Sequence, residues 1–463
     1  MMPALAFDAD LLRRYDRPGP RYTSYPTAPQ FGSDFGEQAL LRAIQDSNGD
    51  PIPRRLSLYV HVPFCLSPCF YCGCNRVITR DKSRADGYLT HLCREIALIA
   101  PRFDRDREVI QLHFGGGTPN FLSPTQLRCT VDVLKRHFRF SDAPDRDISI
   151  ELDPRTVLPQ DLGELAMAGF NRASLGVQDF DPAVQAAVNR IQGVEQTRAV
   201  VEACREHGFR SVNIDLIYGL PNQTLAGFGR TLETVIAMRP DRLAVYSYAH
   251  LPDMFKAQRQ LDASLLPDAE TKLALLQLAI ETLTGAGYVY IGMDHFALPD
   301  DELAQAQERG GLHRNFMGYT THADSDLIGL GVSAISHIGE SFSQNPRDLP
   351  SWQSALDEGR LPVFRGMFLS EDDQLRADLI QRLMCQGEIP ISALERRYAI
   401  DFREYFADAL ERLRPLEADG LVRGASDRID VTARGRLLLR NIAMCFDHYL
   451  QQPAEKPRFS RAI

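Results

Sequence analysis

The sequence lacks the features that would direct the protein to a membrane or to nucleic acid. No apolar run reaches the roughly 18 residues that a membrane-spanning helix needs. The first twenty residues have no basic segment followed by an apolar core, unlike a secretory signal peptide. Basic residues are also too few to dominate, since 52 Lys and Arg stand against 61 Asp and Glu, a net charge of −9. Because phosphate neutralisation needs a basic face, nucleic-acid binding is not expected. We expect a cytoplasmic protein with no membrane span.

Cysteine is scarce as well, with nine residues in the whole chain, but four of them lie in one stretch, "FCLSPCFYCGCN" at 64–75. A structural zinc site normally closes with a second Cys or His pair far along the chain, and the sequence has no such pair. In a reducing compartment, clustered cysteines more often bind metal or do chemistry than form disulfides. The single, scattered cysteines are expected to be small buried residues: Cys93, Cys129, Cys204, Cys385 and Cys445.

The clustered cysteines are spaced C-x3-C-x2-C, with Cys74 two residues after Cys72. That last separation is awkwardly short for two ligands of one metal, so zinc is the weaker interpretation. A cluster held by three cysteines leaves one iron open, and this iron can bind a small molecule and pass it an electron. The spacing therefore favours an iron–sulfur cluster.

Short apolar runs alternate with helical patterns from about residue 55 onward. Repeated β–α units predict a parallel sheet covered by helices, and several runs are apolar almost throughout, as strands buried on both faces are. We expect an α/β fold, an open or incomplete TIM-like β/α barrel, with ligands at the carboxyl ends of its strands. The expected strands are 56–62, 109–114, 148–152, 173–178, 211–219, 242–248 and 288–296.

Three regions are expected along the chain: an N-terminal arm or flap at 1–45, the barrel domain at 46–365, and a mostly helical C-terminal domain at 366–463. The arm contains "DRPGPRYTSYPTAPQF" at 16–31, which fits no helix or strand period. It is either a surface linker or an ordered flap that carries Arg21 and Tyr22 toward a substrate. The C-terminal region begins with a capping-box-like start at Ser370 and Asp373, and its helices and short hairpin resemble a winged helix. The acidic chain makes a substrate lid or packing module more probable than a DNA-binding unit.

Polar motifs follow the expected strands. "HFGGGTP" at 113–119 has three glycines, which let the backbone approach a ligand closely. Singly, each of the other polar residues is most simply a capping or ion-pairing group. Together they suit a ligand with nucleotide and amino-acid parts, because carboxylates accept from ribose hydroxyls and Arg binds a carboxylate. These residues are Glu151, Gln178, Asp179, Arg190 and Asp215.

Stretches from about residue 19 to the C-terminus resemble one family, the oxygen-independent coproporphyrinogen III oxidases, which are radical S-adenosylmethionine (SAM) enzymes. They include "GPRYTSYPTAPQF", "CFYCGCNRVITR", "FGGGTPNFL", "NIDLIYGLP", "IGMDHFALPDDELA" and "RFSRAI". The resemblance implies a barrel of radical SAM type with a 4Fe–4S cluster on Cys65, Cys69 and Cys72. Cys74 matches the additional cysteine of the family, which is not a ligand there. Met317 stands where family members carry Gln, which puts the second-cofactor geometry in doubt.

The resemblance also implies two S-adenosylmethionine molecules. The residues that match the first site are Tyr59, Tyr71, Gly116, Glu151 and Ile335. Those that match the second site are Gly117, Thr118, Gln178, Arg190, Asp215 and Ala249.

The implied reaction is the oxidative decarboxylation of two propionates of coproporphyrinogen III to vinyl groups, through a 5′-deoxyadenosyl radical, giving protoporphyrinogen IX. The tetracarboxylate substrate needs cationic anchors, and Arg21, His313 and Arg314 are the candidates. A flavodoxin- or ferredoxin-like electron donor, an unidentified acceptor and a monomeric state are expected. The alternatives are a haem chaperone, which lacks the "CGC" tail and the "RYTSYPTAP" arm, and another radical SAM enzyme on the same scaffold.

Overall fold

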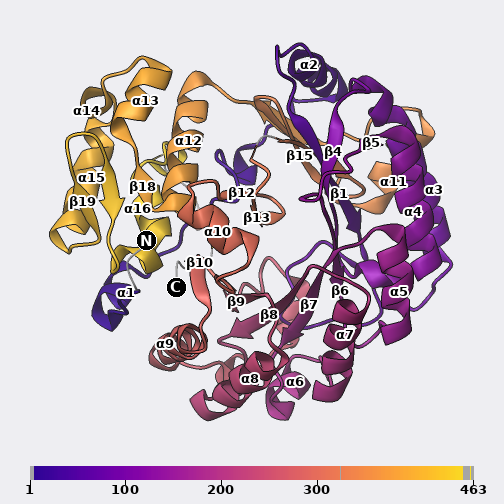
Figure 1. Ribbon diagram of the computed structural model, residues 1–463, viewed down its shortest axis with the longest axis horizontal. Helices are drawn as coiled ribbons and strands as arrows, with labels where there is room; N and C mark the ends of the chain where they lie inside the picture. The colour runs from indigo at the N-terminus through magenta and orange to yellow at the C-terminus, as the bar shows by residue number, and fades with distance from the viewer. Residues whose placement is uncertain (1–4, 324, 452–458, 460–463) are drawn as a thin grey trace. The chain divides into compact units, whose positions relative to one another are not determined.

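The computed structural model describes residues 5–323, 325–451 and 459, so most of the "RFSRAI" stretch lies outside the described residues. The chain divides into two compact units (Figure 1). One, here called the barrel unit, comprises residues 31–268 and 324–368. The other, here called the second unit, comprises 1–30, 269–323 and 369–463. These units group segments that are distant in sequence, and the linear division at 45/46 and 365/366 stays a prediction.

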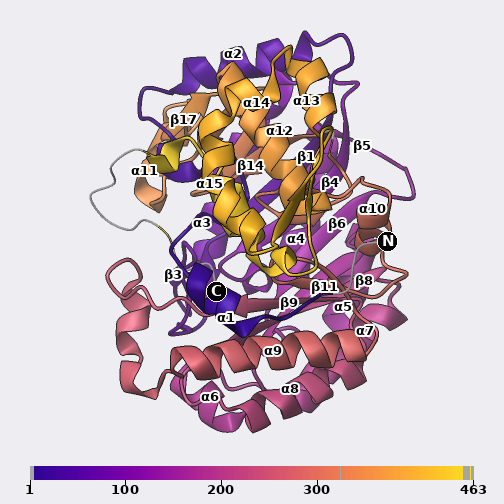
Figure 2. The same ribbon diagram turned by 90° about the vertical axis from the view of Figure 1, so that its left-hand side faces the viewer.

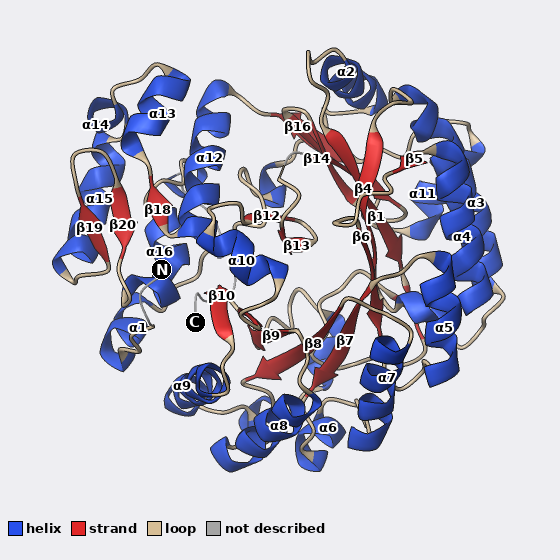
Figure 3. Cartoon of the chain, viewed as in Figure 1, coloured by secondary structure: helices blue, strands red, loops and turns tan. Residues whose placement is uncertain are grey.

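The barrel unit is built on a curved sheet with a parallel part and an antiparallel part (Figure 3). Its parallel strands are, in spatial order, β9 (Arg242–Ser247), β8 (Ser211–Tyr218), β7 (Arg172–Gln178), β6 (Asp147–Leu152), β4 (Glu108–Gly116), β1 (Arg55–Val62) and β14 (Ser325–Leu330). The antiparallel strands β15 (Ile335–Ile338), β16 (Ser341–Gln344) and β17 (Arg365–Phe368) follow β14. The short β5 (Arg139–Phe140) pairs with β4, and β2 (Phe64–Cys65) pairs with β3 (Val77–Ile78). The expected incomplete β/α barrel is confirmed.

Helices cover the outer face of the parallel strands (Figure 1). They alternate with the strands because every second residue of a strand such as β6 is apolar and needs a helix to cover it, while the residues between, such as Ser149 and Glu151, are polar. Leu112, Ile150 and Ile214 are all fully buried. The helices of this unit are α2 (Glu37–Asn48), α3 (Arg84–Ile99), α4 (Pro124–His137), α5 (Pro159–Ala168), α6 (Pro182–Ala187), α7 (Val194–Glu206), α8 (Leu225–Met238) and α11 (Leu349–Asp357).

The second unit is mostly helical (Figure 2). Its helices are α1 (Ala9–Tyr15), α9 (Ala269–Gly285), α10 (Glu302–Glu308), α12 (Glu371–Gln386), α13 (Ile391–Tyr398), α14 (Phe402–Tyr405), α15 (Ala407–Ala418) and α16 (Leu439–Met444). Its short strands are β10 (Val289–Gly292), β11 (His295–Ala297), β12 (His313–Asn315), β13 (Gly318–Thr320), β18 (Glu388–Ile389), β19 (Val422–Gly424) and β20 (Ile429–Val431). The order β18-β20-β19 beside α13 and α15 gives the expected small sheet and hairpin. The expected capping box of α12 is confirmed, since Ser370 and Asp373 each accept from the other's amide.

The arm before α2 belongs largely to the second unit and is ordered. Tyr22 and Tyr25 are buried in that unit's apolar core. The Tyr22 hydroxyl donates to Asp447 at 2.9 Å, and the Tyr25 hydroxyl accepts from the amide of His448 at 3.0 Å. These contacts to the C-terminal region explain why the arm fits no secondary-structure period, because tertiary packing holds it. A simple surface linker does not describe these residues.

No helix among the described residues has both the length and the apolar character needed to cross a membrane.

Candidate active site

The cysteine loop lies at the carboxyl end of β1, where it lines a cavity of about 420 Å³. Cys65 and Cys69 are buried and Cys72 is partly exposed. The guanidinium of Arg76 ties the loop together, since its Nη1 donates to the carbonyl of Cys72 at 3.2 Å and its Nη2 to that of Cys69 at 3.4 Å. One side chain thus folds the loop so that all the thiols face one space.

The thiols differ in how readily they ionise. Hydrogen bonding from Cys74 lowers the pKa of Cys72 to about 6, with Arg76 adding to the effect. Burial raises the pKa of Cys65 to about 11, although Thr118 Oγ1 donates to its sulfur at 3.2 Å. The Cys74 residue is exposed, but its thiol donates inward to Cys72, which raises the pKa of Cys74. Because the thiolate is the form that binds metal, Cys72 is the thiol that is ready at neutral pH.

The glycine loop after β4 fits closely against the cysteine loop. Gly116 has φ of +115°, and a Cβ there would lie 2.7 Å from the ring of His61. A Cβ on Gly117 would lie 2.7 Å from the carbonyl oxygen of Pro63. Only glycine therefore lets this backbone pack so close to His61 and Pro63, in agreement with the close approach that the three glycines predict. The amide of Gly116 donates to Glu151 Oε2 at 3.3 Å.

Two carboxylates, from strands on either side of β7, reach the cavity. Glu151 on β6 also contacts His113, whose Nε2 lies 3.3 Å from Glu151 Oε1. Asp215 on β8 accepts from Asn213 at 2.8 Å and from Ser174 at 3.2 Å. Burial, followed by repulsion from Glu151, raises the pKa of Asp215 to about 7. A carboxylate kept in such surroundings is typical of a binding or catalytic position.

Arg190 is the buried cation of the cavity. Its Nη1 lies 3.5 Å from the sulfur of Cys69, and it pairs with Asp153 at 3.3 Å and donates to the carbonyl of Gly176. Its Nε is buried and has no hydrogen-bond partner among the described residues. A buried N–H without a partner is costly, so this atom suits a ligand acceptor.

The structure brings most of the sequence-predicted residues to this one cavity. Those lining it are Cys65, Cys69, Cys72, Tyr71, Gly116, Gly117, Thr118, Glu151, Gln178, Arg190 and Asp215. Tyr59 does not line it but lies partly buried beside His113, with ring centroids 5.9 Å apart. Ile335 on β15 and Ala249 after β9 also lie outside the lining; the carbonyl of Ala249 accepts from Gln258, which also donates to the carbonyl of Tyr71.

Asp179 is polar and follows a strand, yet it has a structural role. It accepts from Thr231 and from Gln223, each at 2.6 Å, inside the barrel unit. In contrast, Asp153 and Arg155 line the cavity, and sequence reasoning did not single them out. Arg155 lies 3.7 Å from the sulfur of Cys69. The signal was present in "ELDPR", directly after Glu151 at the end of the same strand.

The three candidate substrate anchors lie in the second unit. Arg21 is ion-paired with Asp294. Arg314 is buried, donates to the carbonyl of Arg21 at 2.6 Å and lies 5.3 Å from the ring centre of Tyr319. His313 is partly exposed on β12, and Met317 lies in the turn between β12 and β13. Their role as anchors stays a prediction.

The residues of the cavity fit the implied iron–sulfur cluster better than a single ion. Among the described residues, no three His, Cys, Asp or Glu side chains could hold one metal ion. In a 4Fe–4S cluster each thiolate binds a different iron, so its thiols are more widely spread. A polar ligand beside the cluster would find two suitable groups. One is the glycine loop, whose backbone packs closely against His61 and Pro63, and the other is Arg190 Nε, which has no hydrogen-bond partner among the described residues.

Comparison with known proteins agrees with this geometry. Residues 59–235 match the radical SAM superfamily and residues 369–438 the HemN C-terminal domain. The chain is 52% identical over its full length to the oxygen-independent coproporphyrinogen III oxidase of Pseudomonas aeruginosa, covering 100% of each chain. It is 49% identical to that of Escherichia coli K12, covering 99% of this chain and 98% of the other. The solved structure of the Escherichia coli coproporphyrinogen III oxidase HemN matches with a TM-score of 0.91 and 48% identity, covering 96% of this chain and 100% of that one.

The fold is that of a radical SAM enzyme, a class that implies a 4Fe–4S cluster and S-adenosylmethionine. The chain belongs to the family of oxygen-independent coproporphyrinogen III oxidases.

We expect Asp215→Asn to stabilise the cofactor-free protein more strongly at pH 8 than at pH 5. The pKa of Asp215 is about 7 in the folded state and near 3.8 when unfolded, so the folded state favours the protonated form. Stability therefore falls as pH rises through this window, and the amide escapes that loss. Melting temperatures of both proteins at the two pH values check this, with exposed Asp253→Asn as control. An Asp215→Asn effect that is equal at both pH values would contradict the expectation.

Proposed function

We propose that this chain catalyses the oxygen-independent decarboxylation of two propionate groups of coproporphyrinogen III, giving protoporphyrinogen IX. The observation that carries the proposal is the cavity in which three thiols, a glycine loop and Arg190 meet. The chain that forms this cavity matches an oxygen-independent coproporphyrinogen III oxidase over its full length. The cluster and S-adenosylmethionine, when bound, supply the one-electron radical chemistry. The protein's share is to hold, orient and shield these groups.

Seven residues of the cavity have proposed tasks. Cys65, Cys69 and Cys72 hold the cluster, and Arg76 keeps their loop closed. Glu151 and Asp215 accept from ribose hydroxyls, and Arg190 donates to a carboxylate.

Two S-adenosylmethionine molecules are part of the proposal. Supporting it, members of both matched sets line one cavity: Tyr71, Gly116 and Glu151 from the first, and Gly117, Thr118, Gln178, Arg190 and Asp215 from the second. Equilibrium dialysis of the reconstituted protein with labelled S-adenosylmethionine is expected to give two molecules per chain. A stoichiometry of one would exclude the second site.

The proposal includes an electron donor of flavodoxin or ferredoxin type, a separate electron acceptor, a monomeric protein and a cytoplasmic location. The free thiols found at every cysteine fit a reducing compartment.

The direct test is anaerobic turnover. Protein reconstituted with iron and sulfide, and shown by assay to hold four of each, is incubated with dithionite, S-adenosylmethionine and coproporphyrinogen III. We expect 5′-deoxyadenosine, methionine and two CO₂ per protoporphyrinogen IX. If neither CO₂ nor 5′-deoxyadenosine forms, the enzyme proposal fails, and tight haem binding in its place would favour a chaperone.

A further inference from the structure

An exposed basic face lies directly beside the cysteine loop in the barrel unit. The segment 76–84 carries four basic residues and one acidic residue, although the whole chain has a net charge of −9. Arg80, Lys82 and Arg84 are exposed, as is the apolar side chain of Ile78, at 41%. These four residues are here called the basic face. The basic face begins a few residues after the cysteine loop in the chain. It also lies beside that loop in space, because β3 pairs with Phe64 and Cys65 of β2.

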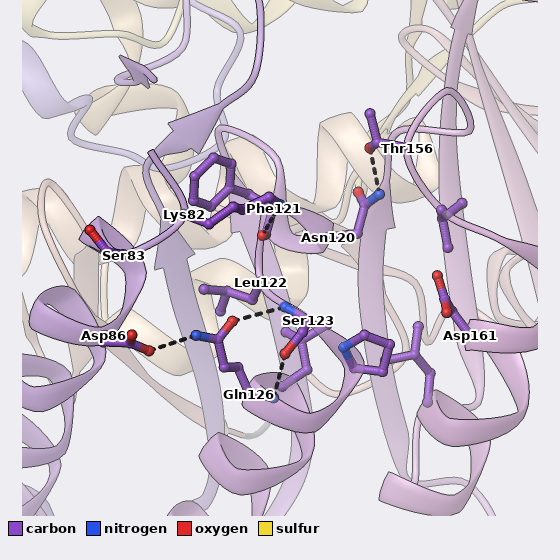
Figure 4. Close-up of a pocket in the computed structure, with 14 residues that line it drawn as sticks. Lys82, Ser83, Asp86, Asn120, Phe121, Leu122, Ser123, Gln126, Thr156 and Asp161 are labelled. Atoms are coloured by element: carbon purple, nitrogen blue, oxygen red, sulfur yellow. Dashed lines mark hydrogen bonds between the residues drawn. The ribbon is translucent and has the colours of Figure 1, made fainter. Parts of the chain in front are cut away.

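Two buried aromatic rings separate this face from Cys65. The Nζ of Lys82 lies 4.1 Å from the ring centre of Phe121, and the guanidinium of Arg84 lies 6.0 Å from that of Phe64. The rings of Phe64 and Phe121 lie 5.1 Å apart, and each is 1% exposed. Figure 4 shows Lys82 alongside Phe121. Lys82 and Arg84 thus lie over two buried rings, and one of these rings belongs to Phe64, the residue directly before Cys65.

The layer of these two rings connects to the cysteine by hydrogen bonds as well as by packing. The amide of Phe121 donates to the carbonyl of Thr118 at 2.9 Å, and Thr118 Oγ1 donates to the sulfur of Cys65 at 3.2 Å. Phe121 and Thr156 line both the cluster cavity and a second hollow of about 550 Å³ beside Lys82 (Figure 4). Phe121 and Thr156 thus form a wall between the hollow beside Lys82 and the cavity lined by Cys65.

Three carboxylates around the face accept hydrogen bonds from neutral donors of the chain and keep their charge. Asp81 accepts from the amide and hydroxyl of Ser83 at 3.0 and 2.6 Å. Asp86 accepts from Gln126 at 2.8 Å, and Asp161 from the amide of Leu158 at 2.9 Å. Within residues 76–84 the four basic side chains outnumber the single carboxylate of Asp81, and Lys82 Nζ also donates to the carbonyl of Phe121 at 2.5 Å. Arg80, Lys82 and Arg84 therefore give this segment the net positive charge with which an acidic partner would pair.

We propose that the basic face docks an acidic one-electron carrier protein, which reduces the cluster through the layer of Phe64 and Phe121. The inference rests on the proposed function, because that reaction needs an electron donor. In the step the carrier loses one electron and the cluster gains it, with no bond made or broken. Charge complementarity steers such encounters and makes them sensitive to salt, and exposed Ile78 supplies an apolar contact.

The test uses reconstituted full-length protein and flavodoxin, an acidic carrier, as the probe. The variants are Arg80→Glu/Lys82→Glu/Arg84→Glu and the milder triple replacement by Gln. The matched control, Arg102→Glu/Arg105→Glu/Arg139→Glu, changes the charge equally at exposed residues near the start of β4 and in β5. Calorimetry gives the Kd at low and at 0.3 M salt, and stopped-flow absorbance gives the rate of cluster reduction by flavodoxin and by dithionite.

We expect the Glu variant to weaken flavodoxin binding and slow its electron transfer at least tenfold, and the Gln variant to do so by a smaller factor. High salt should weaken wild-type binding. The control should stay within twofold. Because dithionite is itself an anion, its reduction rates are compared at 0.3 M salt, where they should be unchanged in every variant.

Other results would overturn the proposal: no flavodoxin binding by the wild type, an equal loss in the control, or slower reduction by dithionite as well. Loss of coproporphyrinogen III binding in the Glu variant would assign the face to the substrate instead. Failure of the wild type to turn over with dithionite would reject the proposed reaction. The Kd values for flavodoxin would still test, independently of turnover, whether the basic face binds the carrier.

Discussion

Replacing Cys65, Cys69 or Cys72 by Ala, one at a time, should remove the iron–sulfur cluster and lower activity by about 10³-fold or more, since the radical chemistry belongs to the cofactor. All three thiols line one cavity, and no other cysteine except Cys74 does. A cluster that lacks one ligand is exposed to solvent and is lost. The measurements are iron and sulfide content, the absorbance of the cluster, and 5′-deoxyadenosine formation with dithionite.

Cys74→Ala and Cys129→Ala are the controls. Cys129 is exposed on α4 outside the cavity, so its replacement should change neither iron content nor activity. Cys74→Ala should keep the iron, because Cys74 is proposed to be no ligand, but it removes the hydrogen bond that lowers the pKa of Cys72. Full iron content in Cys65→Ala, Cys69→Ala and Cys72→Ala would disprove the ligand assignment, and iron loss in Cys74→Ala would make it the fourth ligand.

Arg107→Met should destabilise the barrel unit by about 3 kcal/mol, because it removes the nearer cation of a buried carboxylate and leaves only Arg54, whose Nη1 lies 4.0 Å away. Arg107 Nη2 lies 2.6 Å from Asp326 Oδ2, and these side chains are only 2% and 1% exposed. Asp326 on β14 also accepts from Ser47 and from the amide of Gly339. Arg107, just before β4, further donates to the carbonyl of Arg54 at 2.8 Å. The pair thus joins the start of β4 to β14, across β1.

Thermal unfolding at a fixed scan rate measures this effect, and a fall in Tm on the order of 10 °C is expected. Arg139→Met is the matched control, since Arg139 pairs with Glu108 at 2.9 Å with the guanidinium side chain 59% exposed. Such surface pairs contribute about 0–1 kcal/mol, so its Tm should change little. The double variant Arg107→Met/Asp326→Asn should recover part of the loss. Equal effects of Arg107→Met and Arg139→Met would show that burial of the pair does not matter.

The local features of this protein could be predicted from its sequence. The alternation of short apolar runs with helical patterns identified six of the parallel strands, because period and burial are properties of neighbouring residues. It missed the parallel strand β14. The seven expected strands correspond to β1, β4, β6, β7, β8, β9 and the β10–β11 hairpin. The last expected strand is a hairpin of two strands because the chain turns at Met293, which has φ of +53°. The glycine loop and the capping box of α12 were local in the same way.

The sequence by itself determined the α/β class, the cysteine spacing and the polar residues at the strand ends. Because the strands are parallel, these ends must lie at one edge of the sheet. Only the tertiary structure decided which of those residues face the cavity. Asp179 and Gln178 are adjacent, yet Asp179 turns to Thr231 while Gln178 lines the site. It also placed Arg190 against Cys69, 121 positions away, and Tyr22 against Asp447, 425 positions away. Such contacts depend on how strands and loops stack in space, and residue periodicity carries information only about near neighbours in the chain.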